Sequence, residues 1–539
     1  MESVTYKDTV KFSVVDDILK KNYSQDEFIV IPDNITMIDK YAFAANDSVV
    51  NIQLNKNLKV IGKAAFGSCS KIEKITIPKS VEIIEDSAFS MCKSLKHVYF
   101  ESGSCLTTIG SNAFSNCVKL AGISLPASVT VIKSDAFNNC LSLQNITFPA
   151  NSNLQRIEDR AFANCKWLTG IRIPKPVNYL GKSLFLNDLQ LRDIIFDKES
   201  VLKKIHQQSL EKIPYIRQII IPKNVEVIEE SAFKDCRYLN FVNFAFDSNL
   251  QQIIEDAFFN CGLTEIKLPT TVLRIEEYAF AECENLKKID IFDDIYYIGV
   301  GAFQNCKSLQ SISIPYNLKE ICKNTFYNCM KLQKVEFACG CKLSIVNEHA
   351  FYGCVNLEEV DLPTSVVKIY DEAFYGCENI VSLQISDNID YIGKKSLCAK
   401  NIRIDLPSED IKIVKFKDDM LCDGCNVFYN ENKYQDIVKI NDSKKVTSKK
   451  KHGCYIATCV YGSYNTKELY TLRRYRDEVL AQNIFGRMFI KFYYFVSPTF
   501  VKVFGGSKVF RKFFKKILDK KVVKLNKKGI CNSYYIEEE

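Results

Sequence analysis

The 539-residue sequence predicts a repeat solenoid of short parallel strands and short helical or turn segments, followed by a small, mainly α-helical C-terminal domain. Two observations predict the solenoid: a phrase of roughly two dozen residues recurs through most of the chain, and each copy contains an apolar alternation typical of a strand. A third observation, an abrupt rise in basic and aromatic residues after residue 442, predicts the separate C-terminal domain. A repeat of this length cannot bury its own apolar face, so successive copies must stack and share one core.

An Ala-Phe pair, or a close substitute, anchors each copy of the phrase. Sixteen anchors occur between Ile31 and Leu397, and successive anchors lie 22 to 25 residues apart. Spacing this regular indicates one structural unit per copy. The anchors are Phe43, Phe66, Phe89, Phe114, Phe137, Phe162, Phe185, Leu210, Phe233, Phe258, Phe280, Phe303, Phe326, Phe351, Phe374 and Leu397.

The copy from Leu309 to Cys329 shows how the sequence specifies one unit. Ile312 and Ile314 alternate with serines, as expected of a strand whose apolar side chains face the core and whose polar side chains face solvent. Pro315 then ends the strand, because proline lacks the N–H that a strand ladder needs. The anchor follows in a short helical or turn segment. Five copies are two residues longer, and we expect the extra residues to lengthen a loop without changing the phase of the core.

Cysteine is abundant, with 22 residues, and most of it follows the repeat. Twelve cysteines lie three residues after an anchor, where we expect small buried side chains that form a ladder along the stack, since a free thiol behaves as a compact apolar group. One cysteine per turn does not bring four ligands together, so no metal site is predicted there. So many thiols favour a reducing compartment. The twelve are Cys69, Cys92, Cys117, Cys140, Cys165, Cys236, Cys261, Cys283, Cys306, Cys329, Cys354 and Cys377.

The remaining cysteines leave alternatives open. Cys339 and Cys341, with Cys322 nearby in the sequence, could pair at a loop. Cys422 and Cys425 form a single C-x-x-C, and they lack the second pair of ligands that a zinc ribbon requires. A structural role is favoured over zinc binding there, and no metal or other cofactor is predicted.

The consensus of the copies, I-x-x-x-A-F-x-x-C-x-x-L-x-x-I-x-I-P-x-x-V, resembles the BspA-type leucine-rich repeats. The resemblance covers about 370 residues, from Ile31 to Leu397, and implies a curved leucine-rich-repeat solenoid with a parallel sheet on one face. The family includes many surface-exposed binders. The copies around Phe185 and Leu210 depart from the pattern, because both lack the cysteine and Leu210 also replaces the phenylalanine. We therefore expect a local kink or an irregular stack at Leu210.

Charge divides the chain into two parts. Residues 443–529 contain 22 Lys and Arg against four Asp and Glu, although the whole chain has a formal net charge of only +8. The part before residue 443 is therefore mildly acidic, and the lysine-rich segment between the two parts is typical of a solvated linker. The predicted boundaries are 1–30 for an N-terminal cap, 31–415 for the solenoid, 416–451 for an end cap and basic linker, 452–530 for the helical domain and 531–539 for an acidic tail.

The C-terminal part carries a second set of motifs. Its residues are Cys454, Tyr455, Ile456, Tyr461, Gly462, Arg473, Arg476 and Asp477. In this order they resemble the CFI-box C-terminal domain found in varied bacterial proteins, although Tyr455 replaces the phenylalanine of the name and Cys459 stands where a small residue is common. The resemblance implies a domain boundary and a bacterial origin, and it implies no mechanism.

The C-terminal part is rich in aromatic and basic residues at helical spacing, as in Phe510, Phe513 and Ile517. A small helical core is the favoured interpretation. The alternative is a surface for an anionic membrane, because lysine and phenylalanine at helical spacing suit a lipid interface. No membrane span is expected, since Lys491 and Pro498 interrupt the longest apolar run. Nucleic acid is not expected as a partner, because no recognisable binding motif accompanies the charge.

No catalytic constellation is apparent in the sequence. The four histidines, His97, His206, His349 and His452, fall in different repeats and in the linker, and there is no glycine-rich phosphate loop. The best catalytic candidate is Cys454, whose thiol a neighbouring cation such as His452 would activate. Packing of Cys454 in the C-terminal core is favoured over that role.

The sequence therefore predicts a non-enzymatic interaction protein, whose solenoid binds a protein or peptide and whose basic C-terminal domain docks or anchors it. Aromatic side chains dominate interface energies, so the candidate contacts are Tyr99 and Phe241, with His97 and Asn243 beside them at outward strand positions. The alternatives are a peripheral membrane or surface-associated, adhesin-like protein that the C-terminal part anchors, and a thiol-dependent activity of that part. No signal peptide is recognisable, so a cytoplasmic location is the default expectation, with surface association as the alternative.

Overall fold

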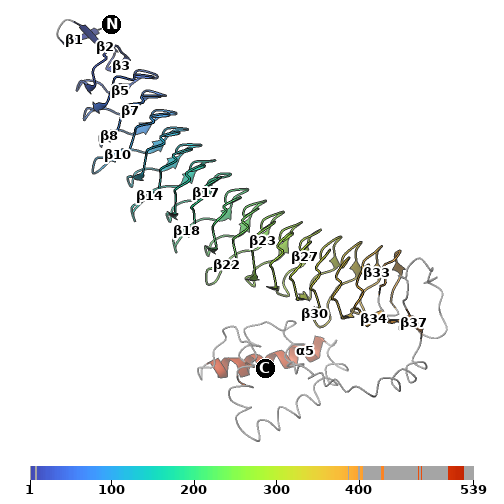
Figure 1. The fold of residues 1–539 in the computed structure, drawn as a ribbon. Helices are drawn as coiled ribbons and strands as arrows, with labels where there is room; N and C mark the ends of the chain where they lie inside the picture. The colour runs from blue at the N-terminus through green and yellow to red at the C-terminus, as the bar shows by residue number, and fades with distance from the viewer. Residues whose placement is uncertain are drawn as a thin grey trace. The chain divides into compact units, whose positions relative to one another are not determined.

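The computed structural model describes residues 2–6, 9–385, 388–398, 401–404, 426–429, 472, 475 and 508–526. The chain divides into two compact units. The first unit comprises Met1–Asp290, Ile298–Gln310 and Asn324–Lys331, and the second comprises Ile291–Tyr297, Ser311–Lys323 and Leu332–Glu539. Most of the repeats belong to the first unit, where they stack turn upon turn (Figure 1).

Each repeat of the first unit supplies one short strand of two residues, and these short strands form parallel ladders. The first ladder begins with three antiparallel N-terminal strands, β1 (Glu2–Tyr6), β2 (Thr9–Val15) and β3 (Ile18–Asn22). It continues through β5 (Met37–Ile38), β7 (Val60–Ile61), β9 (Ile83–Ile84), β11 (Thr108–Ile109), β13 (Val131–Ile132), β15 (Arg156–Ile157) and β17 (Tyr179–Leu180). A second ladder contains β19 (Lys204–Ile205), β21 (Val227–Ile228), β23 (Gln252–Ile253) and β25 (Arg274–Ile275), and β27 spans Tyr297–Ile298.

Each repeat also supplies a long strand of three or four residues, and these strands pair two by two. The pairs are β4 (Phe28–Val30) with β6 (Asn51–Gln53), β8 (Lys74–Ile77) with β10 (His97–Phe100), β12 (Gly122–Ser124) with β14 (Asn145–Thr147), β16 (Gly170–Ile173) with β18 (Asp193–Phe196), β20 (Gln218–Ile221) with β22 (Phe241–Phe244), and β24 (Glu265–Lys267) with β26 (Lys288–Asp290). Burial alternates along them, with Ile75 and Ile77 of β8 buried and Lys74 exposed. The predicted alternation of core-facing and solvent-facing positions is confirmed.

The two-residue insertions in the longer repeats leave the phase of the core unchanged, as the sequence predicts. The strands β10, β14, β18 and β22 belong to longer repeats, and none of them shares a ladder with the long strand that follows. The phase of the core is nevertheless kept, because Phe89 and Phe114, on either side of one insertion, stack with ring centroids 5.3 Å apart. The longer loops therefore leave the core intact.

The described part of the second unit contains the last repeats and a helix. Its long strands form a parallel sheet of β28 (Ser311–Ile314), β30 (Lys334–Phe337), β32 (Glu359–Asp361), β34 (Ser382–Ile385), β36 (Asn401–Ile404) and β37 (Asn426–Tyr429). Its short strands are β29 (Glu320–Ile321), β31 (Ile345–Val346), β33 (Lys368–Ile369) and β35 (Tyr391–Ile392). Helix α5 (Lys508–Asn526) contains the predicted apolar residues Phe510, Phe513 and Ile517.

Stacked phenylalanine rings form the centre of the first unit. From Phe43 to Phe185, neighbouring ring centroids lie 4.9 to 5.8 Å apart. From Phe233 to Phe326 the separations are 5.1 to 5.6 Å. Such near-parallel contacts add to the apolar area that each ring buries. The prediction that the anchors share a core is confirmed in this unit.

From Phe43 to Phe374, each anchor lies in a turn with a left-handed residue two positions before it and another two positions after it. Around Phe114 these are Asn112, with φ of 57°, and Asn116, with φ of 60°. Asparagine tolerates this conformation better than most residues do, because its side chain bonds locally. The Asn187 amide also donates to Asn164 one turn back, at 3.1 Å. These two corners reverse the chain tightly enough for a repeat of this length.

The repeat cysteines form the predicted buried ladder, and their thiols donate to backbone carbonyl oxygens of the preceding turns. The Cys92 thiol donates to the carbonyl oxygen of Phe66, and the Cys140 thiol donates to that of Phe114, both at 3.1 Å. The Phe114 carbonyl also accepts the N–H of Cys117 at 3.2 Å, so both of its lone pairs are used. Burial raises the pKa of the Cys140 thiol to about 12, so the thiol stays protonated and keeps its role as donor.

The regular stack is interrupted at Leu210, as expected. The strands β17 and β19 belong to different ladders, although every residue between them is described. In place of a strand partner, the N–H of Leu180 faces the Nδ1 atom of His206 at 3.5 Å. The phenylalanine stack also stops at Phe185 and resumes at Phe233. The sequence departure at Leu210 therefore marks a real irregularity in the core.

Candidate binding surface

The predicted contacts His97 and Tyr99 lie side by side on strand β10. Both side chains point outward, and their rings stack with centroids 5.8 Å apart. The Tyr99 side chain is 52% exposed. This pair offers a flat aromatic surface. The surface is small, because the residue that faces Tyr99 across the strand pair is Thr76, which is not aromatic.

The other predicted contacts, Phe241 and Asn243, lie on strand β22. Phe241 is 45% exposed and faces Gln218 of β20, while Asn243 faces Ile220. Six strand steps of about 4.8 Å separate β22 from β10, which corresponds to roughly 30 Å. The structure therefore does not bring the four predicted residues together, and they mark two separate places on the first unit.

Three exposed aromatic residues near Phe241 were not predicted from the sequence. Trp167, Tyr215 and Tyr238 are 59%, 48% and 54% exposed, and the rings of Tyr215 and Tyr238 stack at 5.6 Å. All three lie two residues after the repeat cysteine or its replacement. The sequence carried a signal, because ten other repeats hold a polar residue at this position: Lys71, Ser94, Lys119, Ser142, Gln190, Asn285, Ser308, Lys331, Asn356 and Asn379.

The outward face of the neighbouring long strands is also apolar. Ile195 of β18 is 48% exposed and Ile220 of β20 is 62% exposed, and these strands lie next to each other. Equivalent positions in the other strands are mostly polar, such as Thr76 of β8 and Ser124 of β12. The Trp167–Phe241 surface is defined here as Trp167, Arg192, Ile195, Tyr215, Arg217, Ile220, Tyr238 and Phe241. An apolar, aromatic cluster of this kind is typical of an interaction site.

A buried carboxyl group lies in the core of the same turns. Asp188 takes the position of the repeat cysteine, is fully buried, and accepts the N–H of Cys165 through Oδ1 at 2.7 Å. Its Oδ2 atom has no hydrogen-bond partner. Burial raises the pKa of this carboxyl well above its usual value, which outweighs the opposite effect of the bond from Cys165. The group is enclosed in the core, so no substrate can reach it.

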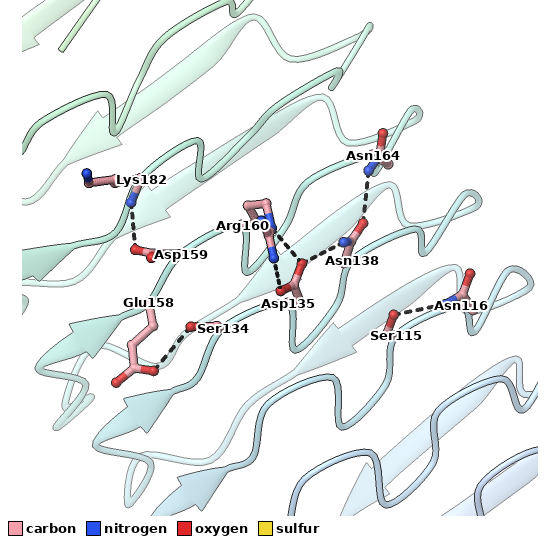
Figure 2. Close-up of polar contacts among 10 residues, drawn as sticks. All are labelled: Ser115, Asn116, Ser134, Asp135, Asn138, Glu158, Asp159, Arg160, Asn164 and Lys182. Carbon is pink, nitrogen blue, oxygen red and sulfur yellow. Dashed lines mark hydrogen bonds and ion pairs between the residues drawn. The ribbon is translucent and has the colours of Figure 1, made fainter. Parts of the chain in front are cut away.

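An ionic network elsewhere in the first unit joins neighbouring turns around Asp135. Figure 2 shows that Arg160 donates two hydrogen bonds, of 3.0 and 2.7 Å, to the Asp135 carboxylate of the preceding turn. Asn138 donates to the same carboxylate, and Asn164 donates to Asn138 at 2.9 Å. Each charge in this network is already matched, so its role is to hold the turns in register.

The described residues contain no arrangement suited to metal binding or membrane spanning. Within them, no group of three or more His, Cys, Asp and Glu side chains could hold a metal ion. In the same part of the chain, no helix has the length and apolar character needed to cross a bilayer.

His206 is mostly buried, which lowers its pKa, and its ring packs against Tyr179 with centroids 4.8 Å apart.

Several predicted residues lie outside the described part of the chain. They are the C-x-x-C residues Cys422 and Cys425 and the C-terminal motif residues Cys454, Tyr455, Ile456, Tyr461, Gly462, Arg473, Arg476 and Asp477.

Comparisons with known proteins agree on the repeat. A family profile for the BspA type leucine-rich repeat region (6 copies) matches residues 21–143, 107–240, 237–345 and 341–425. A leucine-rich repeat protein from Bacteroides ovatus has 22% identity and a TM-score of 0.56, over 80% of this chain and 99% of that one. This likeness shows a shared fold.

Two further solved structures are similar at lower scores. The pneumococcal vaccine antigen PcpA has 21% identity and a TM-score of 0.39, over 78% of this chain and 96% of that one. A leucine rich cell surface protein from Faecalibacterium prausnitzii has 20% identity and a TM-score of 0.32, over 81% of this chain and 96% of that one. No curated protein matches the chain.

Proposed function

The chain belongs to the family of BspA-type leucine-rich repeat proteins, and we propose that it is a non-enzymatic scaffold whose solenoid surface binds a protein or peptide partner. The observation that carries this proposal is the Trp167–Phe241 surface, where large apolar side chains stay exposed above a rigidly stacked core. A preformed surface loses little conformational entropy on binding, so more of the contact energy appears as affinity.

The four residues chosen from the sequence take different places in this proposal. Phe241 lies at one end of the Trp167–Phe241 surface, and Asn243 follows it on the same strand. His97 and Tyr99 form a second, smaller aromatic pair on β10. We place the main contact at Phe241, because hot spots lie within larger apolar clusters that exclude water.

The C-terminal part is a candidate for docking or anchoring on an anionic surface. In α5, Phe513 and Ile517 are exposed one helical turn apart, and Lys512, Lys516 and Lys520 are exposed at the same spacing. Apolar side chains flanked by lysine suit the interface of an anionic membrane. The predicted helical, CFI-box-like domain around α5 and a cytoplasmic location also belong to this proposal.

Capture of partners from a lysate tests the scaffold proposal if matched variants are compared. The tagged full-length protein, Phe241→Ser, Tyr99→Ser and Tyr23→Ser are used at equal amounts, and Tyr23 is an exposed aromatic residue elsewhere in the first unit. We expect one partner to be recovered equally by the wild type and Tyr23→Ser, but about tenfold less by Phe241→Ser, as for loss of an aromatic hot spot.

Equal recovery of every captured protein by the wild type and the three variants would contradict the scaffold proposal. The proposal would also be contradicted if anionic lipid vesicles displaced the captured proteins equally from the wild type and from all three variants. The C-terminal part would then be the binding element.

A further inference from the structure

The Trp167–Phe241 surface combines its apolar side chains with arginines that have no ion-pair partner. Arg192 and Arg217 occupy the same repeat position, directly before β18 and β20, and both are exposed. Arg172 of β16 faces Ile195 across the strand pair, and Arg237 adjoins Tyr238. Arg172 and Arg237 are exposed as well. Four arginines therefore surround one apolar cluster.

Pairing between charged residues is otherwise common in the first unit. Arg160 pairs with Asp135, and Arg274 pairs with Glu276. Lysines also pair across turns, as Lys203 does with Glu226. By contrast, no described carboxylate lies within ion-pair distance of the four arginines around the surface, and Arg192 bonds only to the Gln190 amide oxygen, at 3.5 Å.

The surface carries little negative charge of its own. At the outward positions of β18, β20 and β22, the described residues include one carboxylate, that of Asp193. The nearby Glu211 carboxylate is buried and accepts a hydrogen bond from the Ser183 hydroxyl at 2.7 Å. The cluster is therefore apolar at its centre and cationic around it, which fits a partner of opposite charge with apolar side chains.

We propose that the Trp167–Phe241 surface binds an acidic polypeptide segment that also carries aromatic or aliphatic side chains. This inference rests on the proposed scaffold function and names the chemistry of its partner. Carboxylates of the segment pair with Arg192 and Arg217, whose planar guanidinium groups bind carboxylates with two parallel hydrogen bonds. Apolar side chains of the segment cover Ile195, Ile220 and Phe241.

A polypeptide fits this surface better than a nucleic acid does. Tyr215 and Tyr238 stack on each other, so their facing ring surfaces are not free to stack on bases. Ile195 and Ile220 form the middle of the surface and offer no ring at all.

The chain contains a built-in reporter of binding, because Trp167 is its single tryptophan. It is exposed to water, so a segment that covers the surface should shift its fluorescence emission to shorter wavelength. The full-length protein is titrated with a random copolymer of glutamate and tyrosine, with tryptophan excited selectively. Polylysine and single-stranded oligothymidylate serve as comparison probes. Of the three probes, we expect only the copolymer to shift the Trp167 emission. The shift should become smaller as salt is added, because salt screens the attraction between charges.

Charge-reversal variants locate the binding site. The double variant Arg192→Glu/Arg217→Glu should bind the copolymer about tenfold more weakly or worse, because it replaces two attractions with two repulsions. The matched control is Lys119→Glu/Lys287→Glu, which makes the same change of net charge at exposed positions on other turns. The control should bind within about twofold of the wild type. Tyr215→Ser/Tyr238→Ser provides a second, uncharged test of the same surface.

Three results would overturn the proposal about the partner. They are no shift of the Trp167 emission with the copolymer, a shift with oligothymidylate at least as strong, or equal weakening by the double variant and its control. In each case the scaffold function survives if lysate capture still depends on Phe241. The scaffold function itself fails if capture from the lysate does not depend on Phe241.

Discussion

Replacing Phe258 with alanine is expected to lower the free energy of unfolding of the first unit by about 3–5 kcal/mol. Phe258 is fully buried between Phe233 and Phe280, with ring centroids 5.1 and 5.3 Å away. Alanine leaves a cavity between two rings that cannot move together, because strand ladders fix the spacing of the turns. Urea unfolding followed by circular dichroism measures the effect.

Two controls separate the core from the surface in this measurement. Phe246→Ala removes a ring that is 88% exposed, and it should change stability by less than about 0.5 kcal/mol. Phe258→Leu reproduces the natural residue of the Leu210 turn and should cost less than alanine, because it leaves a smaller cavity. Equal effects of Phe258→Ala and Phe246→Ala would mean that the ring stack does not stabilise the solenoid.

Replacing Asp188 with cysteine is expected to raise the free energy of unfolding by about 1–3 kcal/mol, the range typical of an unsatisfied buried polar group. The substitution removes the unpartnered Oδ2 atom. It also supplies a thiol at the ladder position, where we expect it to donate to the carbonyl oxygen of Phe162, as Cys165 does to that of Phe137. Urea unfolding of the two proteins at neutral pH measures the gain.

The same substitution should change how stability depends on pH. Because the pKa of Asp188 is raised in the folded protein, its contribution is fully present below the unfolded pKa of about 3.9 and is lost as pH rises through the folded pKa. The stability gained by Asp188→Cys should therefore grow as pH rises above about 4. Asp193→Cys, an exposed control, should show no such growth. A gain that is independent of pH would show that Asp188 is charged at no cost.

The core could be predicted from the sequence because one pattern is repeated in every turn. Phe114 and Cys117 lie where the phase of the repeat places them, and stacking makes the environment of each turn nearly the same. The irregularity at Leu210 was predictable for the same reason. The break between β17 and β19 was not predictable in detail, because it depends on how the His206 ring fits against the preceding turn.

The candidate surface was harder to predict, because it belongs to no single repeat. Tyr238 and Phe241 come from one turn, while Trp167 and Arg192 come from two others, and each alone looks like an ordinary exposed residue. The cluster emerges only when equivalent positions of successive turns are placed side by side. Tyr99 was chosen from the same kind of position, but its neighbours across the strands are polar.

Hydrogen–deuterium exchange of the full-length protein, with and without the partner that the wild type captures, tests the central claim most directly. We predict that bound partner protects amides in residues 167–246 and leaves those in 452–530 unchanged. Protection confined to residues 452–530, with none in the solenoid, would contradict the account and make the C-terminal part the binding element.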